Sequence, residues 1–267
     1  MGRYEPFAKR HVRGCCAIAK VCSIEFRIHQ ENNSALGMDG LGRDRRSKGG
    51  MGMSDQTLRD GTIEAFLKLS SAIISDALDL AGVHGTIEGL KTQVQGLKMC
   101  GPAYTVRYTP ASSALHRFAD FMDDVPAGAV VAIDNGGRTD CSVWGDTLSL
   151  FASRHDFAGT IIDGVCRDID GTRDLKYPMF SRGTYMRTGK GRIGVESTLE
   201  PIALSAITIR AGDLIFADDT GAVAIPRERI DEVLAFAEKI AKRDDAYAAA
   251  IKTGAAMADV WVAGAKA

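Results

Sequence analysis

The chain has 267 residues, of which 45% are hydrophobic and 25% are charged, and its formal net charge is −1. These values fit a soluble globular protein and give no indication of a nucleic-acid or membrane partner. No apolar run reaches the roughly 18 residues that a membrane span requires. We see no signal peptide at the N-terminus.

The six cysteines favour a reducing compartment. Cys15, Cys16 and Cys22 lie close together, whereas Cys100, Cys141 and Cys166 stand alone. No CxxC pair suggests a zinc site, and the spacing does not indicate a disulfide framework. We therefore expect a cytoplasmic protein.

Residues 1–52 differ from the rest. The first 50 residues hold ten of the 33 Lys and Arg residues but five of the 34 Asp and Glu residues, with little apolar periodicity. We expect a poorly ordered or peripheral extension before a folded domain at 53–267 that ends in a long helix. Met53 also resembles a natural start, and a functional basic arm is a further alternative.

From residue 55 the predicted elements follow in regular order. Two helices come first, at Ile63–Leu69 and Ser71–Leu80. One or two strands follow around Gly101-Pro102, at Val94–Tyr108, and then a third helix at Ser112–Met122. The next strand, Ala129–Asp134, ends in a tight Asn135-Gly136-Gly137 loop. Next come a helix, a buried strand and a short helix, at Asp146–Arg154, Thr160–Asp163 and Asp168–Leu175.

The C-terminal part begins with short strands. They are predicted at Met179–Ser181, Thr184–Arg187, Ala206–Ile209, Leu214–Ala217 and Ala222–Ile225. Pro226 then precedes a long helix at Arg229–Lys252. Helices that alternate with strands, followed by a block of strands, predict an α/β fold: a single layered sandwich with a central mixed β-sheet flanked by helices.

Two elements of this pattern suggest chemistry. Arg167-Asp168 follows a buried strand, and we expect an Asp163-Gly164 turn to direct it beyond the carboxyl end of the sheet, where ligands bind in open α/β folds. The pair offers a guanidinium and a hard oxygen ligand for a keto acid and a divalent cation. The structural alternative is that Asp168 caps the following helix while Arg167 forms a surface ion pair.

The second element is the helix start Gly145-Asp146-Thr147-Leu148. Its free backbone N–H groups and partial positive charge can receive a carboxylate. The alternative is that Asp146 only interacts favourably with the helix macrodipole. The two elements together predict a site for a 2-oxo acid, a small-molecule substrate.

The segments Asn135-Gly136-Gly137, Trp144 to Leu148 and Asp163 to Asp168 resemble the RraA-like family. An Asp, twenty residues and then Arg-Asp form that family's signature, which Asp146, Arg167 and Asp168 match. The similarity covers roughly Thr57 to Gly254. The family contains class II 4-hydroxy-4-methyl-2-oxoglutarate/4-carboxy-4-hydroxy-2-oxoadipate aldolases and also regulators of ribonuclease activity. The implied fold is the RraA-like, swivelling-domain type.

The resemblance implies a role for each matching residue. Asp168 would be the direct protein ligand of Mg²⁺ or Mn²⁺, with water filling most of the shell. Arg167 would bind and stabilise the pyruvate enolate, and Asp146 would orient Arg167 or a water on the metal. The backbone of Gly145, Asp146, Thr147 and Leu148 would hold the C1 carboxylate. The family site lies between subunits of a trimer or hexamer, to which Asp244 or Asp245 would add a carboxylate; a solvated helix face is the alternative for these two.

The implied activity is metal-dependent retro-aldol cleavage of 4-hydroxy-4-methyl-2-oxoglutarate, or a related diacid, to pyruvate and a second oxo acid. Oxaloacetate decarboxylation would be a side activity. The alternative is a non-catalytic regulator that binds an RNA-processing enzyme; that branch can lack the aspartate that Asp168 provides here. Lys190 and Arg192 could meet a distal carboxylate, whereas scattered His84, His116 and His155 suggest no site.

Overall fold

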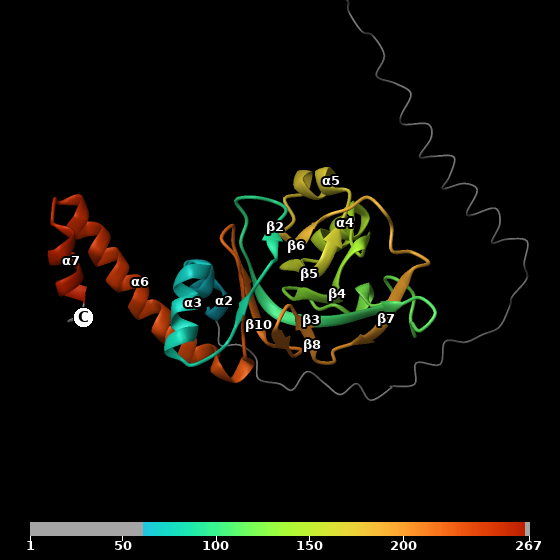
Figure 1. Ribbon diagram of the computed structural model, residues 1–267, viewed down its shortest axis with the longest axis horizontal. Coiled ribbons are helices and arrows are strands. Elements are labelled where there is room, and N and C mark those ends of the chain that lie inside the picture. Colours follow the sequence, from blue (N-terminus) through green and yellow to red (C-terminus); the bar gives the residue numbers. More distant parts are fainter. Residues whose placement is uncertain (1–60, 265–267) are drawn as a thin grey trace, which may run out of the picture. The chain divides into compact units, whose positions relative to one another are not determined.

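The computed structural model describes residues 61–264, so the predictions for residues 1–52 lie outside the described residues. A mixed sheet of nine strands forms the centre (Figure 1), in the order β1-β11-β10-β3-β4-β5-β6-β2, with β7 paired to β3. Its strands are β1 (Thr86–Ile87), β2 (Lys91–Thr92), β3 (Met99–Pro110), β4 (Val130–Ser142), β5 (Gly159–Cys166), β6 (Met179–Thr184), β7 (Ile193–Thr198), β10 (Leu214–Ala217) and β11 (Ala222–Ile225). The predicted α/β class with a central mixed sheet is confirmed.

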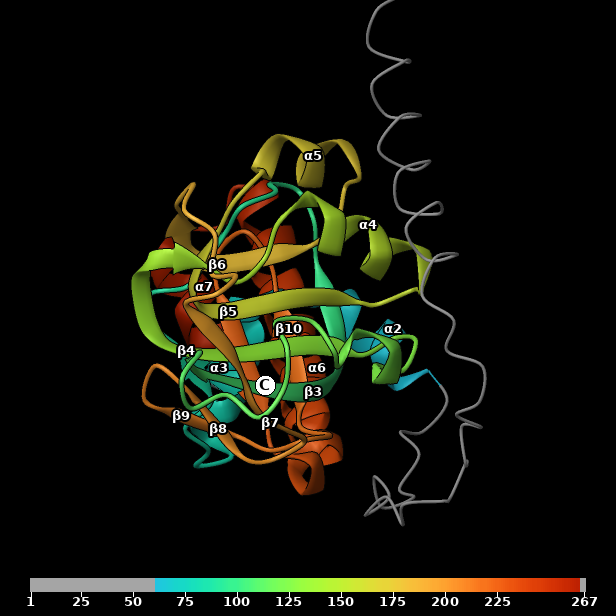
Figure 2. The same ribbon diagram turned by 90° about the vertical axis from the view of Figure 1, so that its right-hand side faces the viewer.

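Strands β3, β4, β5 and β6 run parallel to one another (Figure 2). Every residue of β5 is buried, as expected for an apolar strand covered on both faces. Four antiparallel strands, β1, β2, β7 and β10, pair with this parallel core or with β11. Because β4 and β5 are parallel neighbours, their carboxyl ends lie side by side.

Helices and a hairpin cover the sheet. The helices are α2 (Thr62–Leu67), α3 (Ser71–Leu80), α4 (Asp146–Arg154), α5 (Ile169–Asp174), α6 (Ile230–Lys252) and α7 (Met257–Gly264), with 3₁₀ turns at Met122–Asp124 and Arg227–Arg229. The apolar sides of α4 and α5 pack on one face of the parallel strands, and the β8 (Ile202–Leu204) and β9 (Ile207–Ile209) hairpin packs on the other. Helices α2, α3 and α6 bury β10 and β11.

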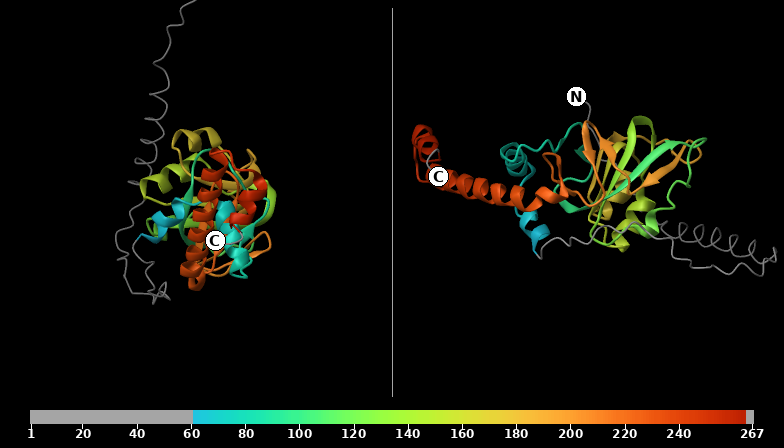
Figure 3. Two further views of the ribbon diagram at one scale, coloured as in Figure 1. Left: turned by 90° about the vertical axis from the view of Figure 1, so that its left-hand side faces the viewer. Right: turned by 90° about the horizontal axis from the view of Figure 1, so that it is seen from below.

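Helix α6 is buried along its first half only. Ile230, Val233, Ala237 and Ile240 contact the core, and the second half continues past α3 to α7 (Figure 3). The prediction of a long helix to Lys252 is confirmed, whereas α7 was not predicted. Between residues 61 and 264, no helix is both long and apolar enough to cross a membrane.

The predicted helix at Ser112–Met122 is wrong. The backbone N–H groups of Leu115 and His116 both donate to the carbonyl of Val195 in β7, at 3.1 Å each. Gly194 permits this approach, because a Cβ there would lie 2.5 Å from the Cβ of Ala114. Pairing with a strand edge therefore replaces the helical hydrogen bonds that the apolar spacing suggested.

Predicted ends of three strands also need correction. Strand β4 continues to Ser142 through register shifts, and Gly136 and Gly137, at φ 61° and 68°, form an irregularity inside it instead of a terminal loop. Strand β5 passes through Asp163-Gly164 without a turn; a Cβ on Gly164 would lie 3.0 Å from Asn135 Nδ2, so close packing accounts for this glycine. The predicted strand after Thr184 is absent, because β6 ends there.

The cysteines that the structure describes are buried free thiols, Cys100, Cys141 and Cys166. Burial, the largest cause, raises the pKa of Cys100 to about 12, with a further increase from nearby Glu64. Burial is also the main reason that the pKa values of Cys141 and Cys166 are raised. Protonated, buried thiols are poor nucleophiles and metal ligands, so these three residues serve as packing groups.

Asp218 ties a distant turn to the start of α3. Its carboxylate accepts hydrogen bonds from the Ser71 backbone N–H at 2.9 Å and from the Ser71 hydroxyl at 2.6 Å. Burial by itself would raise the pKa of Asp218, but the donors of Ser71, Thr220 and Gly221 outweigh it, and the pKa lies below its usual value. The charged carboxylate therefore stabilises the folded state.

We expect acid to weaken the fold through Asp218. The free energy of unfolding should fall as the pH drops from about 4 through the lower folded-state pKa, because the unfolded chain binds the proton more readily. Asp218→Asn should cost about 1–3 kcal/mol at pH 7 and flatten this dependence. Urea denaturation at pH 7 and pH 3 measures both effects, with exposed Asp76→Asn as the control. An unchanged pH dependence in Asp218→Asn would contradict this role.

Candidate active site

Two neighbouring strand ends build the candidate site. The chain leaves β4 at Ser142 and begins α4 at Asp146, and it leaves β5 at Cys166 and begins α5 at Ile169. The Arg167 backbone N–H donates to the Trp144 carbonyl at 2.9 Å, which joins the two connections. The site therefore lies at the carboxyl ends of parallel strands, where α/β sheets bind ligands.

Arg167 and Asp168 form an ion pair in this structure. Arg167 Nε lies 3.1 Å from Asp168 Oδ2, with side-chain exposures of 35% and 43%. Asp168 has the left-handed φ of 52° and its side chain makes no capping hydrogen bond to α5, so the helix-cap alternative is wrong.

Gly145 brings the start of α4 against this ion pair. A Cβ on Gly145 would lie 2.9 Å from Asp168 Oδ2 and 3.4 Å from Arg167 Cγ. A Cβ at this position would force the Asp168 carboxylate to move from its place beside Arg167. The guanidinium, the carboxylate and the first turn of a helix are thereby brought together, as the sequence predicted.

Asp146 contacts the backbone of its own helix and not Arg167, the first of the two partners expected for it. Its Oδ1 accepts the Thr147 backbone N–H at 2.6 Å, and no ion pair joins Asp146 to Arg167 among residues 61–264. The Thr147 N–H, one of the four backbone N–H groups predicted to bind a substrate carboxylate, therefore already donates to Asp146. Gly171 of α5 allows Asp146 to pack closely, because a Cβ there would lie 2.8 Å from the Asp146 Cβ.

A buried polar network holds α4 against α5. Trp144 Nε1 donates to Ser149 Oγ at 3.0 Å, and Ser149 Oγ lies 2.9 Å from Thr172 Oγ1. The Trp144 ring, 1% exposed, stacks on Tyr177 with 6.4 Å between centroids. Burial, only partly offset by a hydrogen bond to Thr160, raises the pKa of Tyr177, so it remains a neutral packing group. This network fixes the positions of both helix starts.

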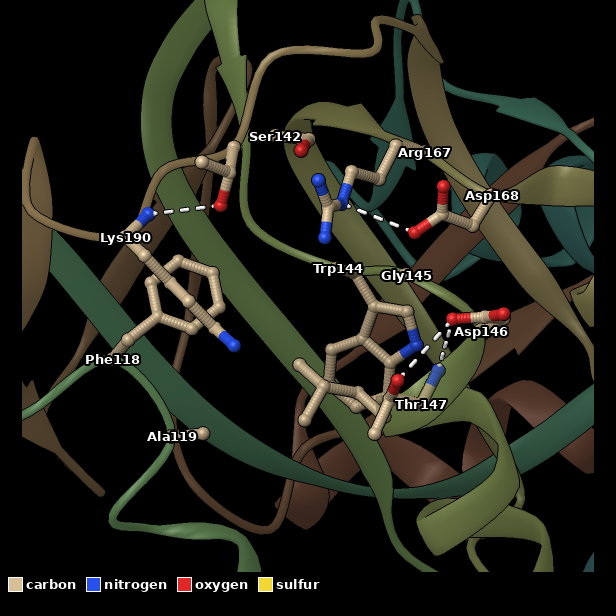
Figure 4. A pocket seen from close by; sticks show the side chains of 12 residues that line it. Phe118, Ala119, Ser142, Trp144, Gly145, Asp146, Thr147, Arg167, Asp168 and Lys190 are labelled. Atoms are coloured by element: carbon tan, nitrogen blue, oxygen red, sulfur yellow. Dashed lines mark hydrogen bonds and ion pairs between the residues drawn. The ribbon is translucent and has the colours of Figure 1, made fainter. Parts of the chain in front are cut away.

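A cavity of about 120 Å³ opens beside these groups (Figure 4). In this view Arg167 and Asp168 lie on one side, and Phe118 and Lys190 lie on the other. Six predicted residues and Lys190 line the cavity: Gly145, Asp146, Thr147, Leu148, Arg167, Asp168 and Lys190. The rest of the lining was given no role from the sequence: Phe118, Ala119, Ser142, Trp144 and Thr188.

Other candidates lie outside this cavity. Arg192 is absent from its lining and donates to the Thr188 carbonyl at 3.1 Å. Asp244 and Asp245 lie on α6, and Asp244 accepts from Arg243 at 3.0 Å. His84, His116 and His155 do not line this cavity.

The carboxylates of the site could hold a cation only together with water or substrate. Between residues 61 and 264, no group of three His, Cys, Asp or Glu residues is arranged to bind a metal ion. Asp168 is the better placed oxygen donor, because its side chain faces the cavity without capping a helix. Such a sparse donor set suits Mg²⁺, which usually keeps several waters and takes one or two carboxylates.

Fold and site thus define an α/β protein with a small cavity at its strand ends, lined by a guanidinium, a carboxylate and the start of a helix. The RraA-like family model, described as Aldolase/RraA, matches residues 71–224, which is more than half of the chain. The chain belongs to the RraA-like family.

Two relatives illustrate the similarity. The chain is 38% identical over 198 residues to protein DlpA of Legionella pneumophila; the match covers 73% of this chain but 32% of DlpA, so the chain spans about a third of that relative. It is 33% identical over 190 residues to a Halalkalibacterium halodurans protein named "Putative 4-hydroxy-4-methyl-2-oxoglutarate aldolase", covering 71% of this chain and 88% of the relative.

Two solved structures share the fold. An uncharacterized protein from Pseudomonas syringae pv. tomato superposes with a TM-score of 0.71 at 36% identity, over 75% of this chain and 96% of its own. RraAS2 of Streptomyces coelicolor, described as an unusual member of the RNase ES inhibitor RraA protein family, gives a TM-score of 0.65 at 25% identity, over 71% of this chain and 96% of its own.

Proposed function

We propose that the protein is a divalent-metal-dependent class II aldolase. It cleaves 4-hydroxy-4-methyl-2-oxoglutarate, or a related 4-hydroxy-2-oxo diacid, to pyruvate and a second oxo acid, with oxaloacetate decarboxylation as a side activity. The observation that carries the proposal is the Arg167–Asp168 ion pair beside the start of α4 in one small cavity. The aldolase name of the Halalkalibacterium halodurans relative supports it.

Asp168 is the residue that would hold Mg²⁺ or Mn²⁺. When bound, the cation would polarise the keto group and offset the negative charge that develops on the substrate. Arg167 would donate from its guanidinium to the same keto oxygen, a charge-assisted hydrogen bond that strengthens as the oxygen becomes an enolate. Backbone N–H groups at the start of α4, other than that of Thr147, would receive the C1 carboxylate.

The bond changes of the proposed reaction balance without a redox partner. A base takes the proton of the C4 hydroxyl, the O–H electron pair forms the new C4 carbonyl, and the C3–C4 bond breaks. Its electron pair becomes the pyruvate enolate, which is protonated at C3. In residues 61–264 no hydrogen bond is made to Asp146 Oδ2, so this oxygen is assigned to hold the water that receives the C4 proton. Lys190 would pair with the distal carboxylate.

We also propose a homotrimer or hexamer, as the family resemblance implies. Apolar side chains on α6 and α7 are exposed in the single chain: Ile251 by 47%, Met257 by 51% and Trp261 by 62%. Their burial between copies would favour assembly. The assembly would bring Asp244 or Asp245 of a second subunit to the site. Light scattering should give three or six times the chain mass of 28.5 kDa, and a monomer would contradict this.

A coupled assay for pyruvate tests the proposed reaction. Purified protein with Mg²⁺ or Mn²⁺ should release pyruvate from 4-hydroxy-4-methyl-2-oxoglutarate and from oxaloacetate, and EDTA should stop both reactions. Restored turnover after the cation is added back would exclude irreversible damage by the chelator. Turnover that persists in EDTA would contradict metal dependence.

The second candidate is a non-catalytic regulator that binds an RNA-processing enzyme. The similarity to RraAS2 supports this alternative. The presence of Asp168 opposes it, because the regulator branch can lack that aspartate. Stable binding to an RNA-processing enzyme, with no metal-dependent release of pyruvate from either substrate, would favour the regulator.

A further inference from the structure

The cavity wall opposite Arg167 and Asp168 is formed by a segment to which no role has been assigned so far. Phe118 and Ala119 contribute this wall, and both are half-buried. Leu148 adds apolar surface from α4. A substrate whose keto acid end contacts Arg167 would direct its C4 substituents toward this wall.

Phe118 is held firmly at the wall. Its carbonyl accepts the Tyr108 hydroxyl at 2.6 Å, and the two rings lie 5.6 Å apart. Tyr108 is 6% exposed in β3, and its burial raises its pKa, so the hydroxyl keeps the proton that it donates. The same segment pairs with β7 through His116 and Val195, with hydrogen bonds of 3.1 and 3.3 Å. Contacts on both sides of the segment thus fix the position of the ring.

We infer that Phe118 determines substrate specificity by limiting the size of the substituent on C4. This inference rests on the proposed aldolase function and assigns the distal wall of that site. A fixed ring in a cavity of about 120 Å³ leaves little room for a larger group. Apolar walls distinguish substituents by about 10- to 200-fold for each methylene group, so removal of the ring should alter the ratio of rates for different substrates.

Steady-state kinetics on a homologous series tests this assignment. The substrates are 4-hydroxy-2-oxo acids whose C4 substituent grows from hydrogen to methyl, ethyl and phenyl, with oxaloacetate as the small reference. In Phe118→Ala, the ratio of kcat/KM for phenyl over methyl should rise about 10-fold or more, mainly through KM. Oxaloacetate turnover should stay within about 3-fold of the wild type, because oxaloacetate carries no alkyl or aryl substituent on C4 that could reach the ring.

Two further variants and a binding measurement complete the design. In Phe118→Leu the ratio of kcat/KM for phenyl over methyl should rise by a smaller factor. Leu115→Ala, on the same segment but 76% exposed, should leave this ratio unchanged. Trp144 lines the cavity, so a change in protein fluorescence reports ligand binding without a further substitution. With Mg²⁺, 2-oxo-4-phenylbutanoate should bind more tightly to the Phe118→Ala protein, while oxalate affinity stays unchanged.

The outcomes separate this inference from the proposed function. Proportional changes for all substrates in Phe118→Ala, with an unchanged melting temperature, would overturn the specificity assignment and leave the aldolase intact. No turnover of any substrate by the wild-type protein with Mg²⁺ or Mn²⁺ would overturn both.

Discussion

Replacing Asp168 with alanine is expected to lower kcat/KM for pyruvate release by about 1,000-fold or more. The loss follows because the substitution removes the assigned protein ligand of the cation, whose charge stabilisation is worth several kcal/mol, and each 1.36 kcal/mol is tenfold in rate. It also leaves Arg167 without its ion-pair partner at 3.1 Å. The coupled pyruvate assay with Mn²⁺ measures the effect.

A neighbouring carboxylate provides the matched control. Asp170 lies in the first turn of α5, its side chain is 95% exposed, and it pairs with Arg173 on the protein surface. Asp170→Ala removes the same charge and should keep kcat/KM within about 3-fold, since exposed ion pairs contribute little. Equal losses in both variants would point to a general electrostatic effect, and full activity in Asp168→Ala would show that the metal ligand is misassigned.

The second large effect is expected from adding a single methyl group at Gly145. In Gly145→Ala the new Cβ would lie 2.9 Å from Asp168 Oδ2, so the carboxylate or the start of α4 must shift. Displacements near 1 Å at reacting groups cost about 100-fold in rate. We therefore expect kcat to fall by about that factor, measured in the same pyruvate assay.

Gly221→Ala is the control for the added methyl group. A Cβ at Gly221 would meet no atom within 4 Å, and this glycine lacks a positive φ. Its activity should equal that of the wild type. If Gly145→Ala kept full activity, the close approach of α4 to Asp168 would have no part in the reaction.

The juxtaposition of Arg167, Asp168 and the start of α4 could be predicted because each group is local in sequence. Arg167 and Asp168 follow one strand directly, and Gly145 begins the helix after the neighbouring strand. Parallel neighbours end at the same edge of a sheet, so strand order alone brings them together. The fold class could be predicted from the order of helices and strands along the chain. The irregular second half of β4, in contrast, was predicted to be a loop.

The distal half of the site depends on contacts that sequence periodicity does not report. Phe118 belongs to a segment with helical spacing, yet hydrogen bonds from Leu115 and His116 to Val195, far along the chain, prevent a helix. The small residue that allows this approach is Gly194, for which the sequence gives no separate signal. Tertiary hydrogen bonds overrode local propensity here.

A crystal structure of the full chain with Mn²⁺ and oxalate, a planar analogue of the pyruvate enolate, tests the central claim most directly. We expect anomalous scattering from Mn²⁺ beside the Asp168 carboxylate, with oxalate contacted by the Arg167 guanidinium and by backbone N–H groups at the start of α4. Mn²⁺ bound away from Asp168, or oxalate without contact to Arg167, would contradict it.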